Sequence, residues 1–152
     1  TAMCADLGAR TIREELDAMM VLGIDPIQRL VVPRVLACML VAVFLNGLVS
    51  VVGVVGGYIF NVLLQGGTPG AYLASFTALA QTPDLWQGMA KALVFGLIAA
   101  IVSTYKGMNA DGGPQGVGQA VMESVVITFM LLFVANFVMS ALYFQLVPAK
   151  AL

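Results

Sequence analysis

Charged side chains that could make specific contacts gather in one short stretch, GARTIREELDAMMVLGIDP, which runs from residue 8 to residue 26. On a helix of about 3.6 residues per turn, one side of this stretch is charged and the other is apolar. The charged side holds Arg10, Arg13, Glu14 and Asp17, with Glu15 nearby, and the apolar side holds Ile12, Leu16, Met19 and Met20. A face of mixed sign suits contacts with a protein, whereas a helix in the headgroup layer is usually basic. A headgroup-bound helix stays open as the alternative.

We expect this amphipathic helix to cover residues 5–22. Gly23 is suited to its C-terminal cap, and Pro26 prevents its continuation toward the next segment. Its two pairs of arginine and acidic residue at i,i+4 would each add only about 0.2–0.5 kcal/mol. Such pairs do not explain why so much charge is concentrated here.

The composition of the chain indicates the class of protein that carries this helix. Hydrophobic residues make up 61% of the sequence and charged residues only 10%, where soluble domains have about 25% charged residues. This composition is typical of a membrane protein. The net charge of -1 argues against a nucleic-acid partner, because no basic face is available to neutralise phosphates.

Three apolar segments are long enough to cross a hydrocarbon layer of about 30 Å. We expect the spans to be residues 35–64, 85–105 and 124–147. Glycine and proline interrupt residues 65–84, which we interpret as an extracytoplasmic loop with a short interfacial helix. Residues 106–123 are expected to form a cytoplasmic loop. The fold class is therefore an all-α polytopic membrane protein, with a cytoplasmic amphipathic helix followed by three transmembrane helices.

The distribution of lysine and arginine predicts the orientation, because these residues are retained on the cytoplasmic side. In the three-span arrangement, Arg10, Arg13, Arg29, Arg34 and Lys106 fall on one side, and Lys91 and Lys150 fall on the other. The charged N-terminal stretch is therefore expected in the cytoplasm, and the C-terminal tail outside. The first residue is not methionine and no cleavable signal sequence is visible, so we expect earlier spans to be missing and this chain to be the C-terminal part of a longer membrane protein.

Catalytic, metal-binding and cofactor-binding motifs do not emerge from the sequence. The chain has no histidine, and Cys4 and Cys38 are expected to be unpaired thiols, so a zinc site has little support. The glycine-rich segment DGGPQGVG does not match the phosphate-binding pattern G-x-x-x-x-G-K-[ST], and we interpret it as a tight turn before the third span. We therefore expect no catalytic residue, metal or cofactor in this chain, and nucleotide to bind a partner.

Small residues within the spans favour close packing between helices. Gly53 and Gly57 form a G-x-x-x-G pair, and Ala92, Gly96 and Ala100 repeat at every fourth position. The third span carries a stripe of aromatic residues with polar neighbours, namely Phe129, Phe133, Asn136, Phe137 and Ser140. This stripe could line a path for a lipid, or it could be an ordinary core or lipid-facing stripe.

Lys91 is the only ionisable candidate deep within a predicted span. Ion-coupled transporters use such groups as relays. Lys91 lies two turns from the outer end of its span, so we expect it to snorkel to the interface. This expectation removes most of the support for ion-coupled transport, and the spans contain no acid–base pair for an intramembrane enzyme.

Two separated motifs resemble the MlaE/YrbE permeases, the membrane subunits of MCE-type lipid ABC transporters. GARTIREELDAMMVLGIDPIQRLVVPRVLA is similar to the cytoplasmic segment of that family, and NADGGPQGVGQAV is similar to the loop before its last span. The residues in register are Gly8, Glu14, Asp17, Ala18, Gly23, Pro26, Pro33 and Arg34. The resemblance covers essentially the whole chain, and REELDAM favours the actinobacterial YrbE branch.

The resemblance implies that residues 5–22 form a coupling helix that docks on a separate cytoplasmic ABC ATPase, which would bind ATP and magnesium. Glu14 and Asp17 match family positions and are the first candidates for the contact, followed by Arg10, Arg13 and Glu15. The family also places an amphipathic helix and two spans before this region, and we assign no residues there.

We therefore predict a permease subunit that moves lipids or other hydrophobic molecules, such as phospholipids, fatty acids or sterols, across the inner (plasma) membrane of a bacterium. A second permease copy, identical or paralogous, should complete the path, because three spans cannot enclose a lipid. Extracytoplasmic MCE proteins should receive or deliver the substrate. A non-transporting scaffold subunit of a multiprotein membrane complex is the alternative.

Overall fold

The computed structural model describes residues 1–80 and 82–146, and these residues form helices joined by short connections. The helices are α1 (Ala2–Ile12), α2 (Glu15–Val21), α3 (Val32–Ile59), α4 (Pro69–Leu79), α5 (Thr82–Met108) and α6 (Gly113–Leu146). Three helical segments are long and apolar enough to cross a membrane, namely Ile27–Leu64, Pro83–Met108 and Gly113–Leu146. The predicted all-helical fold with three membrane-spanning helices is confirmed. Val147 and Lys150, which entered the predictions above, lie outside the described residues.

The amphipathic stretch is not the single helix that its periodicity predicts. α1 ends at Ile12, and Glu14 adopts a left-handed conformation, with φ 58° and ψ 18°, before α2 begins. A non-glycine residue rarely takes this conformation, which turns the chain sharply between two helices. The predicted charged face is therefore divided between α1, the turn and α2. We call residues 10–17 the elbow.

Local chemistry explains how α2 ends and how α3 begins. Gly23 has φ 74°, its N–H donates to the Met20 carbonyl, and the Ile24 N–H donates to the Met19 carbonyl. This is a Schellman cap, and it confirms the predicted role of Gly23. Residues 27–31 then form a π-helical turn that ends just before α3 begins at Val32. Pro33, the second residue of α3, has no backbone N–H and so cannot donate the regular α-helical hydrogen bond.

The connection between α5 and α6 is shorter than the loop predicted over residues 106–123. α5 continues to Met108 and α6 begins at Gly113, so only residues 109–112 lie between them. Gly112 and Gly113 have φ of 87° and 73°, which favours glycine at both positions. A side chain at Gly116 would overlap the backbone carbonyl of Asp111, so that glycine is also required sterically. The second family-like motif therefore forms a tight turn and a helix start.

Helix α5 is the centre of the bundle. Ala92 and Ala100 are buried on it, and a Cβ atom at Gly96 would lie 3.0 Å from the Ala42 Cβ and 3.1 Å from the Met39 Cα on α3. The predicted small-residue stripe therefore packs against α3. The predicted Gly53 and Gly57 pair does not join two spans in this chain, because Gly53 faces open space and Gly57 lies under Tyr72 of α4.

At the C-terminal end of α5, helix α1 packs against both α5 and α6. A Cβ atom at Gly107 would lie 2.8 Å from the Cys4 carbonyl oxygen, and one at Gly8 would lie 3.0 Å from Val117 of α6. Cys4 and Leu7 are completely buried in this contact. Close backbone approach therefore joins the N-terminal helix to two of the membrane-spanning helices.

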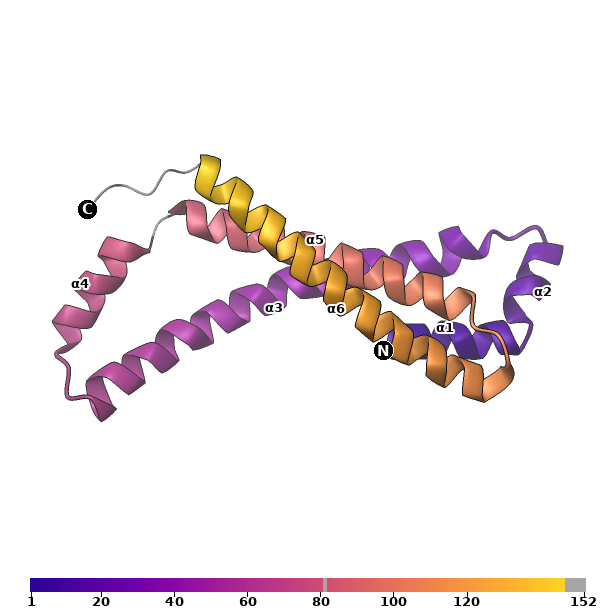
Figure 1. Cartoon of the computed structure of the whole chain (residues 1–152), viewed down its shortest axis with the longest axis horizontal. Helices are drawn as coiled ribbons and strands as arrows, with labels where there is room; N and C mark the ends of the chain where they lie inside the picture. Colours follow the sequence, from indigo (N-terminus) through magenta and orange to yellow (C-terminus); the bar gives the residue numbers. More distant parts are fainter. Residues whose placement is uncertain (81, 147–152) are drawn as a thin grey trace.

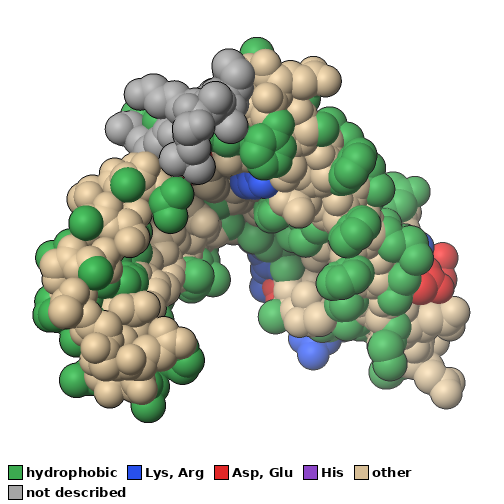
Figure 2. Space-filling model, turned by 60° about the vertical axis from the view of Figure 1, so that its left-hand side comes forward, with side chains coloured by type: hydrophobic (Ala, Val, Ile, Leu, Met, Phe, Trp, Pro, Cys, Tyr) green, Lys and Arg blue, Asp and Glu red, His purple; other side chains and the backbone are tan. Residues whose placement is uncertain are grey.

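The long axis of the molecule separates two chemically different ends (Figure 1). One end carries α1, α2, the start of α3 and the α5–α6 turn, and the other carries α4 beside the far end of α3. α4 is attached there by a hydrogen bond from the Tyr72 hydroxyl to the Val54 carbonyl, 2.9 Å long. Figure 2 shows hydrophobic side chains over the visible face, which is hollowed between two lobes, and charged side chains in only a few places.

Substitution of Gly96 should test the contact between α3 and α5. Gly96→Val places side-chain atoms against the α3 backbone, so we expect a loss of stability of about 1–3 kcal/mol, measured by thermal unfolding in mild detergent. Gly53→Val is the matched control, because Gly53 lies in a helix with open space around it. Equal effects of the two substitutions would contradict the proposed packing.

Candidate functional site

A chain of ion pairs joins the elbow to the start of α3. Arg10 lies 3.5 Å from Asp6 and 3.6 Å from Glu15, and Arg13 lies 3.8 Å from Glu15. Asp6 also pairs with Arg34. The i,i+4 pairs expected within one helix, Arg10 with Glu14 and Arg13 with Asp17, are wrong, because the left-handed turn at Glu14 interrupts the helical spacing. The observed pairs connect α1, the elbow and α3 by charge.

Glu14 and Asp17 are exposed, and neither takes part in an ion pair or hydrogen bond through its side chain among the residues that the structure describes. Both lie at the start of α2, where the positive end of the helix dipole favours negative charge. The structure thus divides the five predicted coupling residues. Arg10, Arg13 and Glu15 are engaged within the chain, and the two carboxylates that match the family motif face outward.

Apolar side chains accompany these carboxylates on α2. Met20, Val21 and Leu22 are 56%, 87% and 74% exposed at the end of the helix. Beside them lies an open groove of about 500 Å³ that includes Asp17 and Met20 of α2 and Met108 of α5. An exposed apolar helix end next to unpaired carboxylates, with a groove alongside, has the composition of a protein docking surface.

The two arginines beside Asp6 lower the pKa of its carboxyl group below its ordinary value of 3.8, mainly through the hydrogen bond from Arg34. The lowered pKa means that the folded state favours the ionised form. The contribution of this group to stability is therefore fully present above pH 3.8 and is lost as the pH falls through the lowered value. Because the Asp6 side chain is 49% exposed, solvent weakens each pair.

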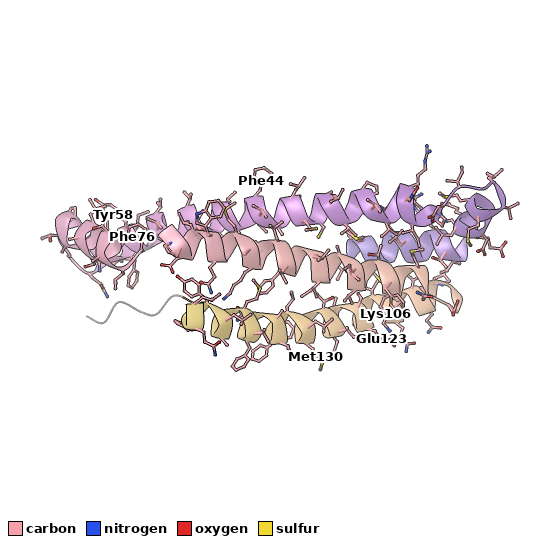
Figure 3. The ribbon with its side chains drawn as sticks, turned by 90° about the horizontal axis from the view of Figure 1, so that it is seen from above. Phe44, Tyr58, Phe76, Lys106, Glu123 and Met130 are labelled. Carbon is pink, nitrogen blue, oxygen red and sulfur yellow. The ribbon has the colours of Figure 1, made fainter. Side chains whose placement is uncertain are left out.

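The aromatic stripe of α6 does not line an enclosed path within this chain. Phe129, Phe133 and Phe137 are each more than 70% exposed on the outer surface of α6. Figure 3 shows that Met130 of the same helix and Phe44 of α3 also point outward, on opposite sides of the bundle. Any path lined by these phenylalanines needs a second surface to face them.

The polar members of the predicted stripe have a different environment. The Lys91 ammonium of α5 donates to the Asn136 Oδ1 at 3.1 Å and to the Ser140 Oγ at 2.8 Å. The expectation that Lys91 snorkels to the interface stays a prediction, and the structure adds that its head group is bound by α6. Sequence reasoning missed this contact, although a lone cation and two polar residues in facing spans were a usable signal.

A second interhelical contact closes the opposite end of the same pair of helices. Lys106 of α5 and Glu123 of α6 lie 2.8 Å apart (Figure 3), and Gln119 donates to the same carboxylate. The sequence analysis placed Lys106 on the cytoplasmic side but did not pair it with Glu123. α5 and α6 are therefore joined by polar contacts at two levels, one within the helices at Lys91 and one near the α5–α6 turn at Lys106.

The fold and these contacts define a multi-pass helical membrane protein with a charged elbow at one end. The model of the permease MlaE family matches residues 1–142, and the chain belongs to that family. It is 39% identical over 145 residues to a probable ABC transporter permease protein of Synechocystis, and 33% identical over 144 residues to one of Rickettsia prowazekii. These alignments cover 95% of this chain and 55% and 56% of the two relatives.

A plant protein is also similar to this chain. The chloroplastic protein TRIGALACTOSYLDIACYLGLYCEROL 1 of Arabidopsis thaliana is 32% identical over 145 residues, which are 95% of this chain and 41% of that protein. The chain thus spans about half the length, or less, of these relatives. The preference for the actinobacterial branch stays a prediction.

Substitution of Asp6 should test whether the ion pairs hold α1 in place. Asp6→Asn removes the attraction to Arg34 and Arg10, so α1 should leave its site more often and expose Cys4, which is fully buried. We expect alkylation of Cys4 at neutral pH, followed by peptide mass spectrometry, to become about 2–5 times faster. Glu14→Gln is the control and should leave the rate unchanged. Identical rates for Asp6→Asn and the unmodified chain would contradict a holding role.

Proposed function

We propose that this chain is part of the permease subunit of an ABC transporter that moves lipids or other strongly apolar molecules. The observation that carries the proposal is the elbow. In a chain of the MlaE family, it presents two outward carboxylates, Glu14 and Asp17, beside an exposed apolar helix end. We propose that a separate cytoplasmic ATPase binds this surface and supplies ATP and magnesium, and that the chain itself binds no cofactor.

The surface of the bundle supports an apolar substrate. The phenylalanines of α6 are exposed, and large apolar side chains are also exposed along most of the length of α3. The Arabidopsis relative is named after a galactolipid. Phospholipids, fatty acids and sterols share the apolar chemistry that such a surface accommodates.

Further partners follow from the same surface. Three spans cannot surround a lipid, so a second permease subunit, identical or paralogous, would face the exposed stripe of α6. MCE proteins would carry the substrate beyond the membrane. The basic residues at the elbow end favour a cytoplasmic location for that end, in the bacterial inner membrane.

The contacts suggest how movement of α2 would reach the spans. Arg10 of the elbow pairs with Asp6 of α1, Asp6 pairs with Arg34 of α3, and α1 packs closely against Gly107 of α5. A force on α2 would therefore act on α3 through the chain and on α5 and α6 through α1. Packed helices transmit such displacements because their contacts leave little free space.

Charge reversal at the elbow tests the proposal. In the complete transporter in lipid vesicles, Glu14→Lys with Asp17→Lys should place like charges against the ATPase and reduce ATP-driven lipid movement by about tenfold or more. The measurements are transport of a fluorescent phospholipid and recovery of the ATPase with the purified permease.

Asp111→Lys is the matched control, because Asp111 is an exposed acidic residue in the α5–α6 turn at the same end of the molecule. It should leave transport and ATPase recovery unchanged. Normal transport by the doubly reversed variant would contradict the coupling role. Absence of ATP-dependent lipid movement in the unmodified complex would instead favour the scaffold alternative.

A further inference from the structure

Lys91 carries a positive charge well inside a membrane-spanning helix. It lies about 12 Å along α5 from Pro83, at about 1.5 Å per residue. Placing a lysine in the hydrocarbon region costs about 2.5–3.5 kcal/mol on insertion scales, so such residues usually have a partner or a function. The surroundings of Lys91 therefore need an explanation.

The partners of Lys91 within the chain are neutral. Its ammonium group has three N–H donors, and two of them are used by the Asn136 amide oxygen and the Ser140 hydroxyl. Within residues 1–80 and 82–146, the ion pairs all involve other lysine and arginine residues. The charge is thus oriented but not neutralised, and one donor is left over.

Lys91 also lines an apolar groove on the side of α5 that faces α3. The groove has a volume of about 390 Å³ and lies between α3 and α5. Its lining consists of Lys91 and Asn46 together with Ala42, Leu45, Val49, Gly88, Ala92 and Phe95. A ligand that fits must have an apolar chain and an anionic group that can accept hydrogen bonds.

We propose that Lys91 binds the phosphate of an anionic phospholipid whose acyl chain lies in the groove between α3 and α5. This inference rests on the proposed lipid-transport function and names the substrate class. A phosphate supplies the missing negative charge, and it has enough oxygen atoms to accept from both Lys91 and the Asn46 amide. Asn136 and Ser140 position the ammonium group without neutralising it, so the neutral partners become part of the site.

Two features argue against a purely structural role for Lys91. A lysine that only joined α5 to α6 would be stabilised further by an acidic partner, as Lys106 is by Glu123 at the other end of the same helices. A lysine that only extended toward the interface would need no partners on another helix, whereas Lys91 donates to both Asn136 and Ser140 of α6.

The test compares lipids bound to the complete transporter in nanodiscs of mixed phosphatidylglycerol and phosphatidylcholine. Photoactivatable analogues of both lipids, and of a free fatty acid in a separate sample, are crosslinked and quantified by mass spectrometry. The unmodified complex should enrich phosphatidylglycerol in peptides from α3 and α5. Lys91→Met should reduce that enrichment by about tenfold, the loss expected for one charge-assisted hydrogen bond, and Lys91→Arg should retain it.

Asn136→Asp provides the sharper variant, because it keeps the lysine and the shape of the side chain but adds an internal carboxylate 3.1 Å from the ammonium. It should reduce enrichment as Lys91→Met does, whereas Lys106→Met, which removes a cation at the other end, should not. Unchanged enrichment in Lys91→Met and Asn136→Asp would overturn the proposal, as would labelling by the fatty acid alone. The Glu14 and Asp17 reversals should keep the enrichment while transport is lost, so failure of the coupling role is distinguishable.

Discussion

Close backbone approach along one helix, α5, is the contact on which the arrangement of this protein depends. In a bilayer, helix association gains little from the hydrophobic effect and depends on van der Waals packing and interhelical hydrogen bonds. Gly96 admits α3 and Gly107 admits α1, and the residues between them on this face, Ala100 and Thr104, are buried. Larger side chains at these positions would separate both neighbouring helices from α5.

The same contacts determine which groups are free to act. Because α1 is buried against α5 and α6, its charged residues are directed to its outer edge, where Asp6 pairs with Arg10 and Arg34. α2 has only Leu16 buried and therefore projects from the bundle. The proposed coupling to an ATPase would use this combination of a packed helix and a projecting one.

Much of the fold could be predicted because it depends on local composition. Long uncharged segments predict the spans, and Gly23 predicts a helix end through its tolerance of positive φ. The break at Glu14 could not be predicted, since the helical periodicity continues through it and a glutamate rarely adopts the left-handed conformation. Likewise, the start of α6 at Gly113 depends on how Gly116 meets the Asp111 carbonyl, which periodicity does not report.

The candidate sites differ in predictability for a related reason. Glu14 and Asp17 are exposed on their own helix start, so a linear motif is enough to identify them. The partners of Asp6 and Lys91 lie on α3 and α6, and only the crossing of helices brings them together.

The contacts of Asp6 and Lys91 also differ in their surroundings. The Asp6 pair is partly exposed to solvent and is correspondingly weak, whereas Lys91 lies in a segment able to cross a membrane, where an uncompensated charge has the larger energetic consequence. A cation held in place by neutral groups within an apolar wall therefore provides a directed attraction for an anion arriving along that wall, and α5 presents it on the same helix that receives α1 from the elbow.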